Sequence, residues 1–175
     1  MGRGTRAGVI GLGGLGHLAV QFAAKMGAEV TVFSSSKGKE AAAREFGAKR
    51  FVVGAQGKPG SMDFILSTVS ADLDWNPFIE LLAPDGKLCF VGVAPKPIQV
   101  SAFSLIGGRK SVCGSPIGGR KDIRRMLDFA AQRGVRAQTE ALPLAKVNEA
   151  IAKVRRNQAR YRMVLINEDS SRQEA

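Results

Sequence analysis

Ala7-Gly8-Val9-Ile10-Gly11-Leu12-Gly13-Gly14-Leu15-Gly16-His17 is the stretch that decides the fold. It predicts a short buried strand that turns on glycines and continues directly into an amphipathic helix. In the spacing Gly11-x-Gly13-x-x-Gly16, the first glycine permits a tight turn, the second lets a pyrophosphate approach the backbone, and the third lets helix and strand pack closely. The free N–H groups at the helix start would then face the anion. A chain with 21 glycines produces such spacings by chance, so the surrounding sequence decides whether the motif is real.

Strand and helix patterns alternate along the chain around this stretch. Short runs rich in β-branched and apolar residues alternate with segments whose apolar residues recur at helical spacing. The expected strands after the first cover 28–33, 51–53, 62–69, 87–93 and 111–114, and the expected helices cover 14–26, 39–46, 75–82 and 119–133. This order predicts βαβ units and an α/β fold, a Rossmann-type doubly wound parallel sheet of about six strands. It also supplies the strand–turn–helix context that the glycine motif requires.

Two helices carry an apolar face that the pattern assigns to the interior. In the first helix this stripe consists of Leu15, Leu18, Ala19, Phe22, Ala23 and Met26. In the helix at 119–133 the inward residues are expected to be Ile123, Met126, Leu127 and Ala130, with basic residues outward. Between the expected helix at 75–82 and the expected strand at 87–93, Pro84-Asp85-Gly86 is expected to form a turn.

The C-terminal part of the sequence departs from this alternation. Residues 136–142 are expected to be extended, a helix opens at Pro143-Leu144, and 161–166 form a strand. We therefore predict a Rossmann dinucleotide-binding domain at 7–134 and a strand-helix-strand extension at 135–167 that attaches to something outside this sequence. The polar residues 168–175 are expected to form a disordered tail.

Charge and hydropathy limit the classes of partner. The formal net charge of +11 is compatible with nucleic acid, an anionic membrane surface or a phosphate-rich ligand. The basic residues are scattered and aromatic residues do not interleave with them, which favours solvated helix faces over nucleic-acid binding. No apolar run has the length needed to span a bilayer, and the first six residues lack a signal-peptide core. We therefore expect neither a nucleic-acid partner nor a membrane partner.

Cysteine and histidine content predicts no metal site and no catalytic residue in this chain. Cys89 and Cys113 lie far apart without a CxxC pair, which argues against a disulfide scaffold and a structural zinc site. Both thiols are expected to be reduced and buried, in a cytoplasmic protein. The single histidine, His17, stands at a helix start, where the helix dipole favours the neutral ring.

The turn after the second strand indicates which dinucleotide is bound. In NAD-binding domains an acidic residue at this point hydrogen-bonds the ribose hydroxyls. Here the position falls at Ser34, followed by Ser35, Ser36, Lys37 and Lys39. Hydroxyl and ammonium groups donate to a 2′-phosphate, and such hydrogen bonds contribute about 1.5–3 kcal/mol each. The sequence therefore favours NADP(H) over NAD(H); in the alternative reading, Ser36 only caps the second helix and the lysines are solvated.

Seven motifs, taken together, resemble one family. They lie at 8–17, 34–36, 63–70, 86–93, 114–118, 143–150 and 160–162. In this order, and over nearly the whole chain up to about Asn167, the sequence resembles the cofactor-binding half of zinc-containing, medium-chain alcohol dehydrogenases. The most similar branch is the cinnamyl alcohol dehydrogenase-like, NADP-preferring one. The resemblance implies an oxidoreductase that transfers hydride between nicotinamide and an alcohol or aldehyde.

The resemblance also assigns residues to the cofactor. The glycine turn would hold the pyrophosphate, and the serine–lysine turn would hold the 2′-phosphate. Residues 68–69 would lie along the cofactor, residues 91–93 would pass under the nicotinamide, and residues 115 and 117 would hold its carboxamide side. The candidate cofactor-binding residues are thus Gly11, Leu12, Gly13, Gly14, Leu15, Gly16, Ser34, Ser35, Ser36, Lys39, Thr68, Val69, Val91, Gly92, Val93, Ser115 and Ile117.

The family resemblance further implies parts that this sequence does not contain. In the family, the catalytic zinc with its Cys and His ligands and the four-cysteine structural zinc site belong to an N-terminal domain. The chain alone is therefore expected to bind NADP(H) without turning over alcohols. The alternative is a stand-alone, non-catalytic NADP(H)-binding module; a methyltransferase fits poorly because the second strand lacks a terminal acid. The resemblance also implies a homodimer formed through the strands near 101–114.

Overall fold

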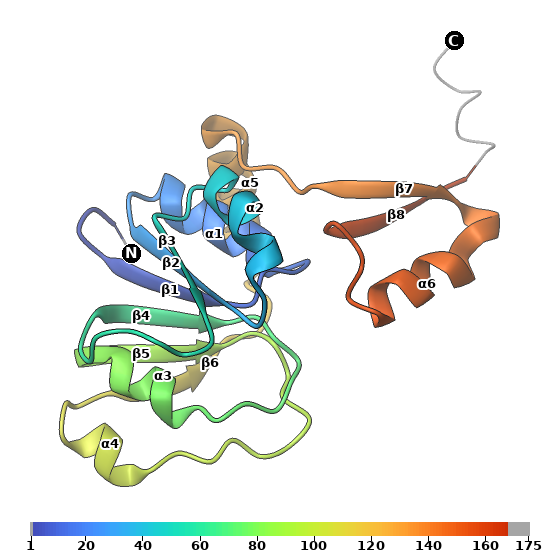
Figure 1. Cartoon of the computed structure of the whole chain (residues 1–175). Coiled ribbons are helices and arrows are strands. Elements are labelled where there is room, and N and C mark those ends of the chain that lie inside the picture. Colours follow the sequence, from blue (N-terminus) through green and yellow to red (C-terminus); the bar gives the residue numbers. More distant parts are fainter. Residues whose placement is uncertain (1, 168–175) are drawn as a thin grey trace. The chain divides into compact units, whose positions relative to one another are not determined.

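The computed structural model describes residues 2–167, and the chain divides into two compact units between Val135 and Arg136 (Figure 1). The predicted tail at 168–175 lies outside the described residues.

The first unit is built on a six-stranded parallel sheet. Its strands are β1 (Arg6–Ile10), β2 (Glu29–Ser34), β3 (Arg50–Val53), β4 (Met62–Ser67), β5 (Leu82–Phe90) and β6 (Ser111–Gly114). They lie in the order β3-β2-β1-β4-β5-β6, and every neighbouring pair in this order is parallel. The chain changes direction across the sheet between β1 and β4, which is the topological switch point at which such sheets bind ligands. The predicted Rossmann-type, doubly wound α/β fold is confirmed.

Helices cover both faces of this sheet. On one face lie α1 (Gly16–Lys25), α2 (Glu40–Glu45) with the short 3-10 helix η1 (Lys37–Lys39) before it, and α5 (Arg120–Arg133); on the other lie α3 (Asn76–Leu81) and α4 (Ala102–Ile106) (Figure 1). Phe22 of α1 stacks on Phe129 of α5, with ring centroids 6.0 Å apart. Under α3, Phe78 meets Phe33 of β2 edge-to-face at 5.6 Å.

The main core cluster lies between the sheet and α3. Its buried members are Ile10, Phe33, Met62, Ile65, Trp75, Phe78, Ile79, Leu81, Leu82 and Leu88. Each such side chain contributes roughly 1.5–3 kcal/mol when fully buried, so this layer holds strands β1, β2, β4 and β5 together.

Helix α1 turns a different face inward from the one predicted. Its buried residues are Gly16, His17, Val20 and Ala23, whereas Leu15 and Met26 of the predicted stripe are 48% and 42% exposed. The helix begins with Gly16 pressed against the end of β1, and this contact sets the rotation of the helix about its axis. The periodicity of apolar residues in the sequence gives no information about that contact.

Two further predictions about helices and turns are wrong. Pro84-Asp85-Gly86 lies inside β5, where Asp85 has φ 61° and the pairing with β4 shifts register between Met62 and Phe64, so the turn residues form an irregularity within a strand. In α5 no residue is fully buried, and the predicted inward Leu127 is 57% exposed. The stacking of α5 on α1 uses Phe129, which is outside the predicted stripe.

The second unit follows the predicted strand-helix-strand order. Strands β7 (Thr139–Pro143) and β8 (Arg162–Ile166) pair in parallel, and the 3-10 helix η2 (Leu144–Lys146) and α6 (Val147–Arg155) connect them. Glu140 of β7 accepts hydrogen bonds from Lys153 Nζ and from the Arg160 N–H, and these bonds lower the pKa of Glu140.

An ion pair between Arg6 and Asp63 joins β1 to β4 at the amino edge of the sheet. Arg6 Nε lies 3.1 Å from Asp63 Oδ2, and the Arg6 backbone N–H donates to the same oxygen at 2.8 Å. The side-chain hydrogen bond from Arg6 is the main cause that lowers the pKa of Asp63. Both side chains are about two-fifths exposed, at 42% and 38%, so solvent screens the pair.

We expect Asp63→Asn to lower the free energy of unfolding by about 0.5–1 kcal/mol at about pH 7. Because pairing lowers the folded-state pKa, this stabilisation is complete above the unfolded-state pKa of about 3.9 and disappears as the pH falls through the lower folded value. Urea unfolding at neutral and at acidic pH measures the loss. Asp128→Asn, at an exposed carboxylate on α5, is the control; a cost of Asp63→Asn that stays constant between the two pH values contradicts the assignment.

Candidate functional site

The loop between β1 and α1 closes on itself through two glycines. Gly11 has φ +89°, and a Cβ at this residue would lie 2.4 Å from Cγ1 of Val69. A Cβ on Gly16 would lie 2.1 Å from the carbonyl oxygen of Gly11. Helix α1 therefore begins directly against the end of β1, and a larger residue at position 16 would push the two apart, whereas one at position 11 would meet Val69 after β4.

Gly13 differs from these two glycines. A Cβ on Gly13 would meet no protein atom within 4 Å, and its φ is outside the left-handed range. Neither steric packing nor the backbone angle therefore requires a glycine at position 13. The adjoining start of α1 has no acidic residue in its first turn and no side-chain cap at Leu15. An open space beside uncapped helical N–H groups favours an anion.

Polar contacts of Thr68 and His17 hold this loop in shape. Thr68 donates to the Ile10 carbonyl through both Oγ1, at 2.9 Å, and its backbone N–H, at 3.1 Å. The Gly13 carbonyl oxygen lies 3.1 Å from the His17 backbone nitrogen and 3.0 Å from His17 Nδ1. The His17 side chain is fully buried. His17 thus positions the loop, a role that the sequence did not predict.

The ends of β4 and β5 join the same cluster. A Cβ on Gly92 would lie 2.3 Å from the Val69 carbonyl oxygen, which shows how closely the chain after β5 approaches the chain after β4. The N–H groups of Val91 and Gly92 both donate to the Ser67 carbonyl, at 3.0 and 3.1 Å. The structure therefore places four candidate residues, Thr68, Val69, Val91 and Gly92, around the end of β4.

The serine–lysine turn after β2 reaches the glycine turn directly. Lys39 Nζ donates to the Leu12 carbonyl oxygen at 3.2 Å, a contact that the sequence did not predict. Ser34 is buried, and its Oγ accepts the Ser36 N–H at 3.4 Å, whereas Ser35 and Ser36 are exposed. Ser36 stands at the N-cap of η1 but makes no side-chain capping bond. The capping bond that the alternative assigned to Ser36 is therefore not formed, whereas the exposed Lys37 agrees with its solvated lysines. The role of this turn toward a ligand stays a prediction.

Three candidate residues lie on exposed loops beyond β5 and β6. Val93 and Ile117 are 79% and 90% exposed. Ser115 is exposed, and its N–H donates to the Phe90 carbonyl at 3.0 Å, which ties the chain after β6 to the end of β5. Their roles toward a ligand stay predictions.

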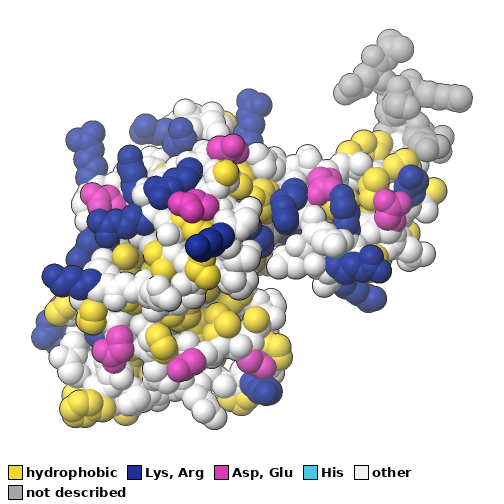
Figure 2. Space-filling model, viewed as in Figure 1, with side chains coloured by type: hydrophobic (Ala, Val, Ile, Leu, Met, Phe, Trp, Pro, Cys, Tyr) yellow, Lys and Arg dark blue, Asp and Glu magenta, His cyan; other side chains and the backbone are white. Residues whose placement is uncertain are grey.

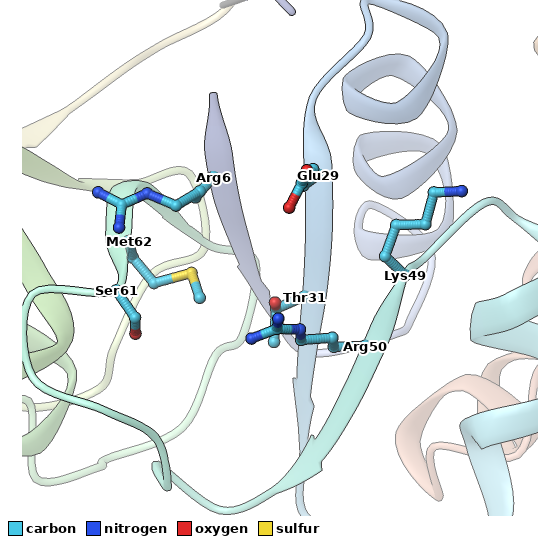
Figure 3. A pocket seen from close by; sticks show the side chains of 7 residues that line it. All are labelled: Arg6, Glu29, Thr31, Lys49, Arg50, Ser61 and Met62. Carbon is cyan, nitrogen blue, oxygen red and sulfur yellow. The ribbon is translucent and has the colours of Figure 1, made fainter. Parts of the chain in front are cut away.

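A separate cavity lies at the opposite, amino edge of the sheet (Figure 3). It has a volume of about 210 Å³ and is lined by Arg6, Glu29, Thr31, Lys49, Arg50, Ser61 and Met62. Arg6, Glu29, Arg50 and Met62 are the first residues of β1, β2, β3 and β4, whereas the glycine turn follows the last residue of β1. This cavity therefore lies away from the glycine turn, and its charges are of both signs.

The remaining surface offers few other site candidates. On the face shown in Figure 2, Lys and Arg side chains are spread over many elements with Asp and Glu among them. Among residues 2–167, no three His, Cys, Asp or Glu side chains come together as a metal site. Over the same residues, no helix has the length and apolar character required to cross a bilayer.

The fold and the turn at its switch point define a dinucleotide-binding domain of the Rossmann class. Residues 14–132 match the family model described as zinc-binding dehydrogenase, and the chain belongs to this family. Over 94% of its length it is 43% identical to a protein of Bacillus subtilis named as a probable formaldehyde dehydrogenase, of which it covers 49%.

Solved structures give the same assignment. A cinnamyl alcohol dehydrogenase from Sorghum bicolor is 40% identical with a TM-score of 0.89, over 94% of this chain and 48% of that one. A cinnamyl alcohol dehydrogenase from Helicobacter pylori, solved with NADP(H), is 33% identical with a TM-score of 0.85 over the same shares. The predicted resemblance to zinc-containing alcohol dehydrogenases is confirmed, and the chain spans about half the length of the curated relatives it matches.

The contrast between Gly16 and Gly13 predicts opposite effects of one added methyl group. Gly16→Ala forces a Cβ against the Gly11 carbonyl and should lower the free energy of unfolding by about 3 kcal/mol or more. Gly13→Ala adds its methyl to open space and should change that energy by less than about 1 kcal/mol. Thermal unfolding without ligand measures both, and equal losses of stability would contradict the geometry described for this loop.

Proposed function

We propose that the first unit binds NADP(H) at the glycine turn, with residues 7–134 as the binding domain. Gly13 carries this proposal, because no protein atom fills the space where its side chain would stand and an uncapped helix start adjoins that space. A pyrophosphate fits such a site, since it requires close backbone approach and N–H donors. The Helicobacter pylori relative was solved with NADP(H), which supports the same class of ligand here.

The 2′-phosphate of the adenosine ribose would lie at Ser34, Ser35, Ser36 and Lys39. Three observations support this: no acidic residue ends β2, Ser35 and Ser36 are exposed, and the Lys39 ammonium lies beside the glycine turn. The hydrogen bond from Lys39 to Leu12 links the two halves of the proposed site. Lys39 would therefore serve the adenosine end while it steadies the loop that holds the pyrophosphate.

The nicotinamide end would lie along the residues after β4, β5 and β6. Thr68 and Val69 pack against the glycine turn, and Gly92 packs against Val69, which supports a cofactor path along these segments. The residues proposed for this part are Thr68, Val69, Val91, Gly92, Val93, Ser115 and Ile117. When bound, the nicotinamide supplies or accepts a hydride, and the role of this chain is to orient it.

In the whole protein, this domain would serve hydride transfer between NADP(H) and a small alcohol or aldehyde. Zinc would polarise the substrate oxygen, held by a part of the protein outside the half matched here. The named dehydrogenases of about twice this length support that arrangement. The extension at 135–167 would return to the catalytic part, which is supported by Leu144 and Val154, 50% and 56% exposed on the second unit. The free thiols of Cys89 and Cys113 fit the reducing cytoplasm.

Titration of the purified chain with NADPH and with NADH, followed by nicotinamide fluorescence, tests the cofactor proposal. We expect tighter binding of NADPH, and we expect Lys39→Gln to weaken NADPH binding about tenfold, which corresponds to about 1.4 kcal/mol, while NADH binding stays within about twofold. Lys25→Gln, at an exposed lysine in the last turn of α1, is the control and should leave the binding of both cofactors unchanged. Equal losses for both cofactors would show that Lys39 acts through the Leu12 loop rather than on the phosphate. Absence of binding of either cofactor would refute the proposed function.

We also propose that the chain forms a homodimer through β6 and α4. β6 is an edge of the sheet, and an uncovered edge strand favours pairing with another chain. Phe103 and Ile106 of α4 are 84% and 74% exposed, which gives this region apolar surface to bury.

We expect sedimentation equilibrium to show a dimer that Phe103→Asp converts to a monomer, because the aspartate would be buried in the interface without a partner. Leu127→Asp, at an apolar residue of α5 that is 57% exposed, should leave the dimer intact. A monomer for the unaltered chain at high protein concentration contradicts the proposal.

A further inference from the structure

Two cysteines face each other across the last two strands of the sheet. Cys89 of β5 and Cys113 of β6 are direct register partners in the parallel pair. Adjacent strands are about 4.8 Å apart, and partnered residues of parallel strands project to the same face. A disulfide requires a Cα–Cα distance of about 4.4–6.8 Å, so the strand spacing already lies within the bonding range. Both cysteines are free thiols.

The two thiols differ in exposure. Cys89 is 7% exposed, and burial together with a hydrogen bond to Cys113 raises its pKa. Cys113 is exposed, against the prediction that both thiols are buried, because it lies on an edge strand. Leu88 and Val112, the neighbouring register pair, pack on the core under α3, so the cysteines project to the opposite face of the sheet.

We propose that Cys89 and Cys113 form a redox-active dithiol that small peroxides oxidise to an intramolecular disulfide. The exposed Cys113 thiolate attacks one peroxide oxygen, the O–O bond breaks, and a sulfenic acid and one water form. The Cys89 sulfur, on losing its proton, then attacks the Cys113 sulfur, and the hydroxyl group leaves as a second water. Two thiols and one hydrogen peroxide thus give one disulfide and two waters.

The position of the pair assigns these two roles. Peroxide reaches the exposed thiol first, also in the proposed dimer, because edge-to-edge pairing of β6 joins backbone groups and leaves side chains on the faces of the sheet. The buried thiol with its raised pKa is the poorer nucleophile toward solvent oxidants. Once Cys113 is a sulfenic acid, its nearest thiol is the register partner, so closure to a disulfide competes well with further oxidation. This chemistry is independent of the proposed cofactor.

Intact-mass spectrometry of the full chain after hydrogen peroxide treatment tests this inference. We expect the loss of two hydrogen atoms, the disappearance of both titratable thiols, a cross-linked peptide containing Cys89 and Cys113, and full reversal by dithiothreitol. The result should hold at low protein concentration, since the link is within one chain.

Two conservative variants separate the roles of the thiols. Cys113→Ser should keep its remaining thiol titratable after peroxide treatment, because the buried Cys89 alone is shielded from the oxidant. Cys89→Ser should leave Cys113 as a sulfenic acid that dimedone traps. Phenylarsine oxide bridges two neighbouring thiols. If it binds the reduced, unaltered chain and neither variant, the pairing is supported independently of oxidation.

Three results would overturn the inference. The first is stepwise addition of oxygen atoms at Cys113 of the unaltered chain, giving its sulfinic or sulfonic acid without loss of two hydrogens. The second is a disulfide found only between two chains on a non-reducing gel. The third is the failure of phenylarsine oxide to bind the reduced, unaltered chain.

Discussion

The contact between residue 16 and the carbonyl of residue 11 governs the arrangement of the first unit. With 2.1 Å available for a Cβ, only glycine lets α1 start where β1 ends. That start fixes which face of α1 is buried, brings His17 under the loop, and places the helix N–H groups beside the open position at Gly13. Thr68 then closes the loop from β4, and Lys39 closes it from η1. The site is thus a consequence of close packing between backbone segments.

The two edges of the sheet differ in the contacts that hold their chain segments together. At the carboxyl edge, glycines at 11, 16 and 92 bring three chain segments together, and helical N–H groups remain uncapped. At the amino edge, Arg6 and Asp63 join β1 to β4 and neutralise each other. A dinucleotide matches the carboxyl edge, whose donors come from the backbone and whose surroundings carry no acid in the first turn of α1.

The sequence allowed the sheet, its order of elements and the glycine turn between β1 and α1 to be predicted, because glycine spacing and strand–helix alternation are local patterns. What it missed depends on contacts between distant segments. The buried face of α1 follows from a contact with β1, the exposure of Cys113 follows from the edge position of β6, and the Lys39–Leu12 bond joins residues on different elements. Asp85 has a side chain and a positive φ that are typical of turns, yet it lies within β5 at the irregularity in its pairing with β4. The candidate residues after β5 and β6 rested on family resemblance, since apolar strand ends look the same whether or not they meet a ligand.

The central claim is that a dinucleotide binds at the carboxyl edge, on the open position of Gly13. Amide chemical shifts of the nitrogen-15-labelled chain, followed during addition of NADPH, test it most directly. The account predicts the largest changes at Gly13, Gly14 and Leu15, further changes at Ser35 and Ser36, and none at Arg50 or Ser61 of the amino-edge cavity. Changes confined to Arg50 and Ser61, with the glycine turn unaffected, would contradict it.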